Sequence, residues 1–77
     1  MQSMTAPRGR LITANTPVVI LDEYGAPIQM IQNTTDGDAN VSFNGGVSFV
    51  VRASETIVFD LPIFGAIESD TDLTVLA

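Results

Sequence analysis

The most informative part of this sequence runs from residue 41 to residue 52 and reads VSFNGGVSFVVR. At its centre, residues 44–46 are Asn-Gly-Gly, which readily take the positive φ angles that a tight β-hairpin requires. After this turn, Val47, Phe49 and Val51 alternate along the chain, so they share one face of an extended strand. The stretch therefore predicts an antiparallel hairpin with one buried face.

Short runs of β-branched and aromatic residues, separated by turn-forming residues, continue over most of the chain. Strands are expected at residues 11–14, 18–21, 28–32, 41–43, 47–51, 56–61, 66–68 and 73–76. No helix is predicted. The fold class is all-β, a small antiparallel β-sandwich or barrel of about 7–8 short strands with an extended N-terminal arm. Residues 1–9 are expected to form this flexible arm, and residues 10–77 a single β domain.

The alternation of apolar side chains also predicts which residues are buried. The expected core contains Val41, Phe43, Val47, Phe49, Val51, Ile57, Phe59, Leu61, Leu73 and Val75. By contrast, residues 17–21 and 61–64 are apolar on both faces. Such segments need two coverings, of which one is the core and the other is either a neighbouring subunit or the second sheet of the sandwich.

The small size and the composition suggest that apolar surface is shared with a partner. A chain of 77 residues buries only about 60% of the surface that its unfolded form exposes. It has no cysteine and no histidine, so neither disulfides nor a structural zinc site can add stability. Yet 45% of its residues are hydrophobic and its mean hydropathy is +0.32. Small scaffolds of this kind commonly oligomerise or dock on something larger.

The charges exclude some classes of partner. Arg8 and Arg10 precede all nine carboxylates, Arg52 is the third basic residue, lysine is absent, and the net charge is −6. Such a chain would be repelled by a phosphate backbone, so no nucleic-acid binding is expected. The longest uncharged stretch, residues 39–51, is too short to span a bilayer, and no apolar run follows the first two arginines. We therefore expect no membrane association and no signal peptide.

Catalytic groups are scarce, and the chain is not expected to be an enzyme or to hold a cofactor. Histidine, cysteine and lysine supply most general bases and nucleophiles, and all three are absent. Asp36, Asp38 and Asn40 have the spacing with which a calcium-binding loop begins, but Val41 and Val47 stand where an EF-hand needs Gly and Glu. Ordinary turn formation explains the three residues better, although a weak calcium site of another type stays open.

Contacts with other proteins are expected at basic, apolar and aromatic residues outside the predicted core. Tyr24 is either an exposed anchor for a partner or a lid over the core edge. Residues 65 and 66, Gly-Ala, either admit a neighbouring backbone or form a simple bend. The expected partner-binding residues are Arg8, Arg10, Val19, Leu21, Tyr24, Ile63 and Phe64.

Several short motifs in residues 28–77 resemble the small β-sandwich virion proteins of tailed bacteriophages. They read IQNT at residues 31–34, VSFNGGV at 41–47, SETI at 54–57, and GAI at 65–67 followed by LTVL at 73–76. Ala53 stands where that family commonly has glycine, and the first 27 residues match nothing specific.

This resemblance implies a non-catalytic structural protein that decorates or cements a phage capsid. The implied partners are the major capsid protein or other virion subunits, together with further copies of the chain, often as a trimer. The implied location is the capsid surface of the virion, with a soluble form before assembly. A role elsewhere on the virion, in the neck, tail or fibre attachment, is the alternative within this class.

Two other classes are less well supported. An acidic inhibitor that mimics DNA needs carboxylates spaced along one surface, whereas Asp36, Asp38, Asp70 and Asp72 cluster in predicted turns. A carbohydrate-binding module needs an exposed aromatic platform. The chain has no Trp and one Tyr, and most of its four Phe fall on predicted core positions.

Overall fold

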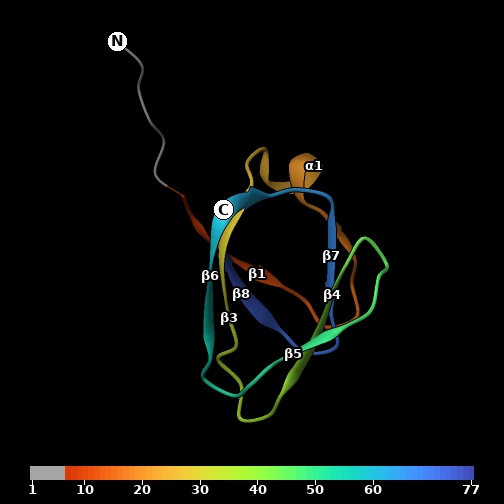
Figure 1. Ribbon diagram of the computed structural model, residues 1–77, viewed down its shortest axis with the longest axis vertical. Coiled ribbons are helices and arrows are strands. Elements are labelled where there is room, and N and C mark those ends of the chain that lie inside the picture. Colours follow the sequence, from red (N-terminus) through yellow and green to blue (C-terminus); the bar gives the residue numbers. More distant parts are fainter. Residues whose placement is uncertain (1–6) are drawn as a thin grey trace.

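Two four-stranded antiparallel sheets form the structure, a computed structural model that describes residues 7–77 (Figure 1). The first sheet contains, in order, β1 (Gly9–Ile12), β8 (Leu73–Leu76), β3 (Ile28–Gln32) and β6 (Thr56–Ile63). The second contains β2 (Val18–Val19), β7 (Ala66–Ser69), β4 (Ala39–Phe43) and β5 (Phe49–Val51). A short helix, α1 (Ile20–Tyr24), joins β2 to β3. The predicted all-β fold is confirmed, as a sandwich whose sheets stay separate and not as a barrel.

The strand order is that of one long hairpin wound around a core. β4 pairs with β5, and moving outward from their turn β3 pairs with β6, β2 with β7 and β1 with β8. This is the strand order of an eight-stranded jelly roll. The β2–β3, β4–β5 and β6–β7 connections lie together at one end of the sandwich, called here the α1 end (Figure 1). The other four connections lie at the opposite end.

The hairpin predicted at residues 44–46 lies at the centre of this winding. Asn44 and Gly45 have φ angles of 55° and 69°, and the Gly46 amide donates a hydrogen bond to the Phe43 carbonyl at 2.9 Å. These are the features of a type I′ turn, whose twist matches that of the strands it joins. Asn44 Oδ1 also accepts a hydrogen bond from the Ala66 amide at 2.8 Å, so the turn is tied to the start of β7.

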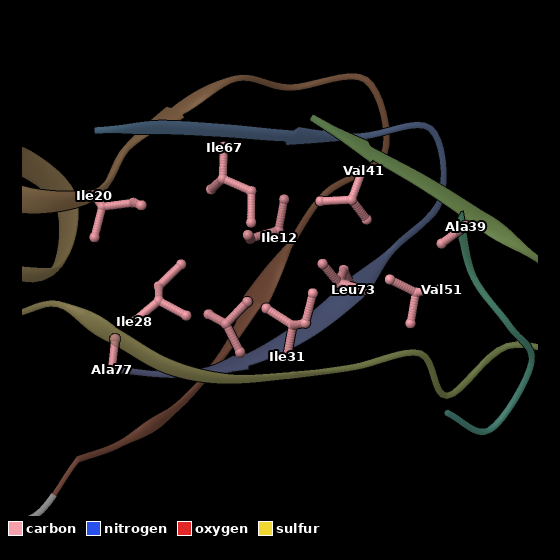
Figure 2. Packing of buried hydrophobic residues seen from close by; sticks show 11 residues of the cluster. Ile12, Ile20, Ile28, Ile31, Ala39, Val41, Val51, Ile67, Leu73 and Ala77 are labelled. Carbon is pink, nitrogen blue, oxygen red and sulfur yellow. The ribbon is translucent and has the colours of Figure 1, made fainter. Parts of the chain in front are cut away.

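The fully buried core is aliphatic, and its side chains point into the space between the sheets (Figure 2). Of the predicted core residues, Val41, Val51, Leu73 and Val75 are fully buried. The predicted Phe43, Phe49, Ile57 and Phe59 are only half-buried and pack against the core from its margin. The core residues that the alternation did not predict are Ile12, Ile20, Ile28, Ile31, Ala39, Ile67 and Ala77.

Two predicted core residues are wrong, because irregularities break the period of two. Val47 is 95% exposed, since β5 begins only at Phe49 and Val47 lies in the link after the turn. Leu61 is 74% exposed. On β3, Ile28 and Met30 are two residues apart, yet their partners on β6 are Ile63 and Val58, which are five apart. The extra residues form a bulge in which Leu61 leaves the core face.

The strand predicted over residues 18–21 is confirmed at residues 18–19 and wrong at residues 20–21. β2 has only two residues, and the chain then turns into α1, although no helix was expected. The two-faced apolar run is explained by this change, because Ile20 can then enter the core from the end of the sandwich (Figure 2). The helix ends at Gly25, whose amide donates to the Leu21 carbonyl at 2.8 Å. Within residues 7–77 no helix is long and apolar enough to cross a membrane.

Most of the expected N-terminal arm, residues 1–6, lies outside the described residues. The last residues of the expected arm, Arg8 and Gly9, join the first sheet. Arg8 and Ala77 exchange two backbone hydrogen bonds, of 2.7 and 3.0 Å, and Gly9 begins β1.

A buried asparagine fastens the loop between β3 and β4. Asn33 is fully buried, and its Nδ2 donates to the carbonyl oxygens of Gly37 at 2.7 Å and Val51 at 2.9 Å. Its Oδ1 accepts from the amide and the hydroxyl of Thr35 at 2.9 and 2.7 Å. The side chain therefore supplies the hydrogen bonds that a strand ladder cannot supply here.

Replacing this asparagine should destabilise the fold. Asn33→Ala removes all four hydrogen bonds and leaves buried backbone groups unsatisfied, so the free energy of unfolding should fall by about 2–4 kcal/mol. Urea denaturation followed by circular dichroism measures this change. The exposed Gln29→Ala is the control and should stay within about 0.5 kcal/mol of the wild type. Equal stability of the two variants would contradict the role given to Asn33.

A second prediction concerns the contact between the β4–β5 turn and the β6–β7 connection. Gly65 has a φ of +100°, and a Cβ there would lie 2.3 Å from Asn44 Oδ1. Gly65→Ala should therefore lower the free energy of unfolding by about 2–3 kcal/mol, through backbone strain and this clash. Gly37→Ala is the matched control, since a Cβ at Gly37 meets nothing within 4 Å. Thermal melts that give the same stability for both variants would refute the assignment.

Candidate protein-binding surfaces

The α1 end presents apolar side chains to solvent. Ile20 is fully buried and its amide donates to the Gly65 carbonyl at 2.8 Å, which fixes α1 beside the β6–β7 connection. The neighbouring Val19, Leu21 and Phe64 remain 50%, 56% and 49% exposed. Three of the expected partner-binding residues are thus brought to the same end of the sandwich. A surface of this kind is typical of a contact with another polypeptide.

An acidic groove of about 450 Å³ runs beside α1, along the β1–β2 side of the sandwich. Its apolar wall includes Leu11, which is 63% exposed, and its acidic wall includes Asp22 and Glu23. Tyr24 lies at the end of this wall. The complete lining is Leu11, Thr13, Thr16, Pro17, Val18, Val19, Asp22, Glu23 and Tyr24.

A basic pocket of about 240 Å³ lies on the other side of Tyr24. It contains both N-terminal arginines, and its lining is Pro7, Arg8, Arg10, Tyr24, Gly25, Ala26, Gln29 and Ala77. The acidic groove and the basic pocket share Tyr24. Opposite charges are therefore placed on the two sides of a single aromatic side chain.

The Arg10 guanidinium is held against Tyr24. Its Cζ lies 4.8 Å from the centroid of the Tyr24 ring, in a cation–π contact, and its Nη2 donates a long hydrogen bond of 3.5 Å to the Tyr24 carbonyl. Arg10 Nε is buried and has no hydrogen-bond partner within the described residues. Arg10 thus has a structural role in placing Tyr24, whereas the side chain of Arg8 is exposed.

Tyr24 keeps its phenol neutral at ordinary pH. Burial raises the pKa of Tyr24 above its usual 10.0, the negative charge of Glu23 raises it further, and the positive charge of Arg10 lowers it. The half-buried ring packs against the core, as expected of a lid, and part of the residue stays accessible, as an anchor for a partner would require.

The charged side chains are divided unevenly over the molecule. At the α1 end, two carboxylates, Asp22 and Glu23, are balanced by Arg8 and Arg10. The net charge of −6 is therefore carried entirely by the rest of the chain. Most of the remaining carboxylates lie in the connections at the opposite end, namely Asp36, Asp38, Glu55, Asp70 and Asp72. The α1 end is the electrically balanced end of the protein.

The outer face of the first sheet is largely uncharged, although Asp60, two residues after Val58 on β6, is exposed beside it. The inward residues Ile12, Ile31 and Val75 define the core face, so the residues that alternate with them point outward. By strand register the outward residues form two rows, Leu11–Thr74–Gln32–Thr56 and Leu76–Met30–Val58. Val58 is 70% exposed. We call these seven residues the uncharged face.

The outer face of the second sheet is polar and acidic by comparison. Glu68 lies opposite Ser42 across the strands, and Asn40 lies opposite Val50. Asp70, just after β7, accepts hydrogen bonds from the amide and the side chain of Asn40, each at 2.8 Å. The two sides of the sandwich thus differ clearly in character.

The three residues that could have formed a calcium site, Asp36, Asp38 and Asn40, are not arranged as one. Asn40 lies in β4 and donates to Asp70, and these bonds hold the pKa of Asp70 below its usual value. Asp36 and Asp38 lie in the preceding loop. Within residues 7–77, no group of three or more Asp, Glu, His or Cys side chains is placed to hold a metal ion.

Some residues of these surfaces were not expected to be functional. The alternation that buries Ile12 could have indicated an outward Leu11, and the uncharged face could have been found from the opposite phase of each strand. The sequence could not have indicated Asp22 and Glu23, because their position depends on α1, which was not predicted. Of the expected residues, Ile63 is half-buried and packs against the core.

Comparison with known proteins gives no relative for this chain. No protein-family model, no curated protein and no solved structure matches it.

The environment of Tyr24 can be tested by titration. Tyr24 is the only tyrosine and there is no tryptophan, so phenolate absorbance reports it alone. We expect its pKa to exceed 10.0 in the folded protein, to rise further in Arg10→Gln and to fall in Glu23→Gln. Because the folded state holds this proton more tightly, its contribution to stability is complete below pH 10 and is lost as the pH rises through the folded pKa. A pKa at or below 10.0 would contradict the structure around Tyr24.

Proposed function

We propose that this chain is a structural protein of a bacteriophage virion, which binds the assembled capsid as a decoration or cement protein. In this role it has no catalytic activity. It stabilises the shell because it binds the assembled state and not free subunits, so that binding energy is added to assembly. A position at the neck or tail would use the same kind of contact.

The observation that carries the proposal is the combination of a jelly-roll strand order with apolar surface left outside the core. Jelly rolls occur repeatedly in viral capsid proteins, although they also occur in lectins and other proteins. The exposed Val58 and Leu61 on β6, and Leu21 and Phe64 at the α1 end, are more apolar surface than a solitary domain of this size needs. The resemblance of its motifs to phage virion proteins agrees with this combination.

The uncharged face is the surface proposed to lie against the shell. It spans the four strands of the first sheet, so it is rigid and needs little ordering upon binding. The chain carries a net charge of −6, and the uncharged face lets it approach a shell while most of its carboxylates stay outside the contact. The acidic connections at the opposite end would then remain in solvent.

The structure gives the rival functions less support. Two acids that a DNA mimic would present have local tasks instead, since Asp72 accepts from the Ala14 amide at 2.9 Å and Asp70 accepts from Asn40. For a lectin, Phe43 stacks on Phe49 at 5.8 Å and meets Phe59 edge-on at 6.1 Å, which places these rings at the margin of the core. They do not form an exposed platform for a sugar.

Co-sedimentation with capsids tests the proposal. The purified chain should pellet with empty capsids of the phage that encodes it, and not with dissociated capsid subunits. Val58→Lys places a charge on the uncharged face and should weaken capsid binding by at least about tenfold. Quantitative gel densitometry across a concentration series measures the apparent dissociation constant.

Val50→Lys is the matched control, because Val50 is also an exposed valine on an edge strand but points outward from the second sheet. It should bind capsids like the wild type. If both variants bind equally well, the shell does not contact the uncharged face. If the wild type stays in the supernatant, capsid binding itself is refuted.

A further inference from the structure

A surface that meets a second copy of itself across a two-fold axis must be complementary to itself. In such an isologous contact, residue i of one copy touches residue j of the other, and residue j touches residue i. A charged patch can satisfy this requirement only if it contains both signs of charge, on opposite sides of a centre. The surface around Tyr24 has this arrangement.

Tyr24 separates the acidic groove from the basic pocket. Asp22 and Glu23 line the groove, Arg8 and Arg10 line the pocket, and Tyr24 lines both. The groove and the pocket together are called here the Tyr24 surface. A two-fold axis near Tyr24 would bring the basic pocket of one copy over the acidic groove of the other, twice. Arg8 is the residue able to reach across, because its side chain is exposed while the Arg10 guanidinium is held against the Tyr24 ring.

The charge distribution favours a second copy as the occupant. Two molecules that each carry a net charge of −6 repel one another, most strongly where their carboxylates are gathered. At the Tyr24 surface the two acids and two arginines balance, and most other carboxylates lie at the opposite end. Two copies can therefore approach here with little repulsion, and opposite charges are available to pair.

Apolar side chains beside the charged groups supply area for such a contact. Leu11 and Val19 line the acidic groove and are 63% and 50% exposed, and Leu21 on α1 is 56% exposed. Their burial would be favourable in itself, while the paired charges would set the register of the two copies.

From this arrangement we infer that the chain forms a two-fold symmetric homodimer through the Tyr24 surface, with Arg8 of each copy against Asp22 and Glu23 of the other. This dimer differs from the trimer that the resemblance to virion proteins implies. It uses the α1 end and leaves the uncharged face free except for Leu11, which lines the acidic groove. The dimer does not depend on the proposed capsid binding, because it is a property of the purified chain alone.

Sedimentation equilibrium of the purified full chain tests the inference. The wild type should show a reversible equilibrium between 8.2 kDa and twice this mass. Arg8→Glu and Glu23→Arg should each weaken dimerisation by at least about tenfold, because each places like charges opposite one another. The double variant, Arg8→Glu with Glu23→Arg, restores the opposite pairing and should dimerise within about threefold of the wild type.

Arg52→Glu is the control, because it changes the net charge as Arg8→Glu does but lies outside the Tyr24 surface, next to β5. It should leave dimerisation within about threefold of the wild type. Circular dichroism melts of every variant confirm that each is folded.

A wild type that stays monomeric or forms a trimer overturns the inference, and so does a double variant that fails to recover. If the chain dimerises but does not bind capsids, the proposed function is refuted and the dimer is not. A monomer that binds capsids would refute the dimer alone.

Discussion

The structure depends on a single thin aliphatic core that both sheets must share. Its fully buried hydrophobic residues are all Ile, Leu, Val or Ala, and no disulfide supports them. In a domain with so little interior, every strand has one face toward the core and the other face on the outer surface. The winding of the chain meets this constraint, because each outer pair of strands encloses the pair before it, from β4–β5 to β1–β8.

The same constraint explains where the polar devices lie. The winding crosses between sheets at both ends, and no strand ladder can satisfy the backbone there. Asn33 fastens the β3–β4 loop from inside, Asn44 joins the β4–β5 turn to β7, and Asp70 joins the β7–β8 turn to β4. The carboxylates that look abundant in the sequence are in part structural, and this weakens any function that needs them all at the surface.

A thin core also leaves apolar side chains outside, and the molecule sorts them into two surfaces of different character. The uncharged face is broad and rigid, and it suits a large partner such as a shell. The Tyr24 surface is smaller, mixes both signs of charge, and suits a partner of matching pattern. One domain could thus contact a shell and a sister copy at the same time, and the two contacts together would bind more tightly than either alone.

The sequence by itself determined the all-β class and the central hairpin, because positive-φ residues between alternating strands are local signals. It also indicated four residues of the buried core, Val41, Val51, Leu73 and Val75, which lie on regular strands. Only the tertiary structure decided that residues 20–24 become a helix, that Val47 and Leu61 face solvent, and that Tyr24 lies between opposite charges. The reason is that these features depend on connections and on a bulge, where the local pattern of apolar residues does not decide the outcome. Ile20 closes the end of the core between β2 and β3, Val47 lies in the link before β5, and Leu61 lies in the bulge of β6.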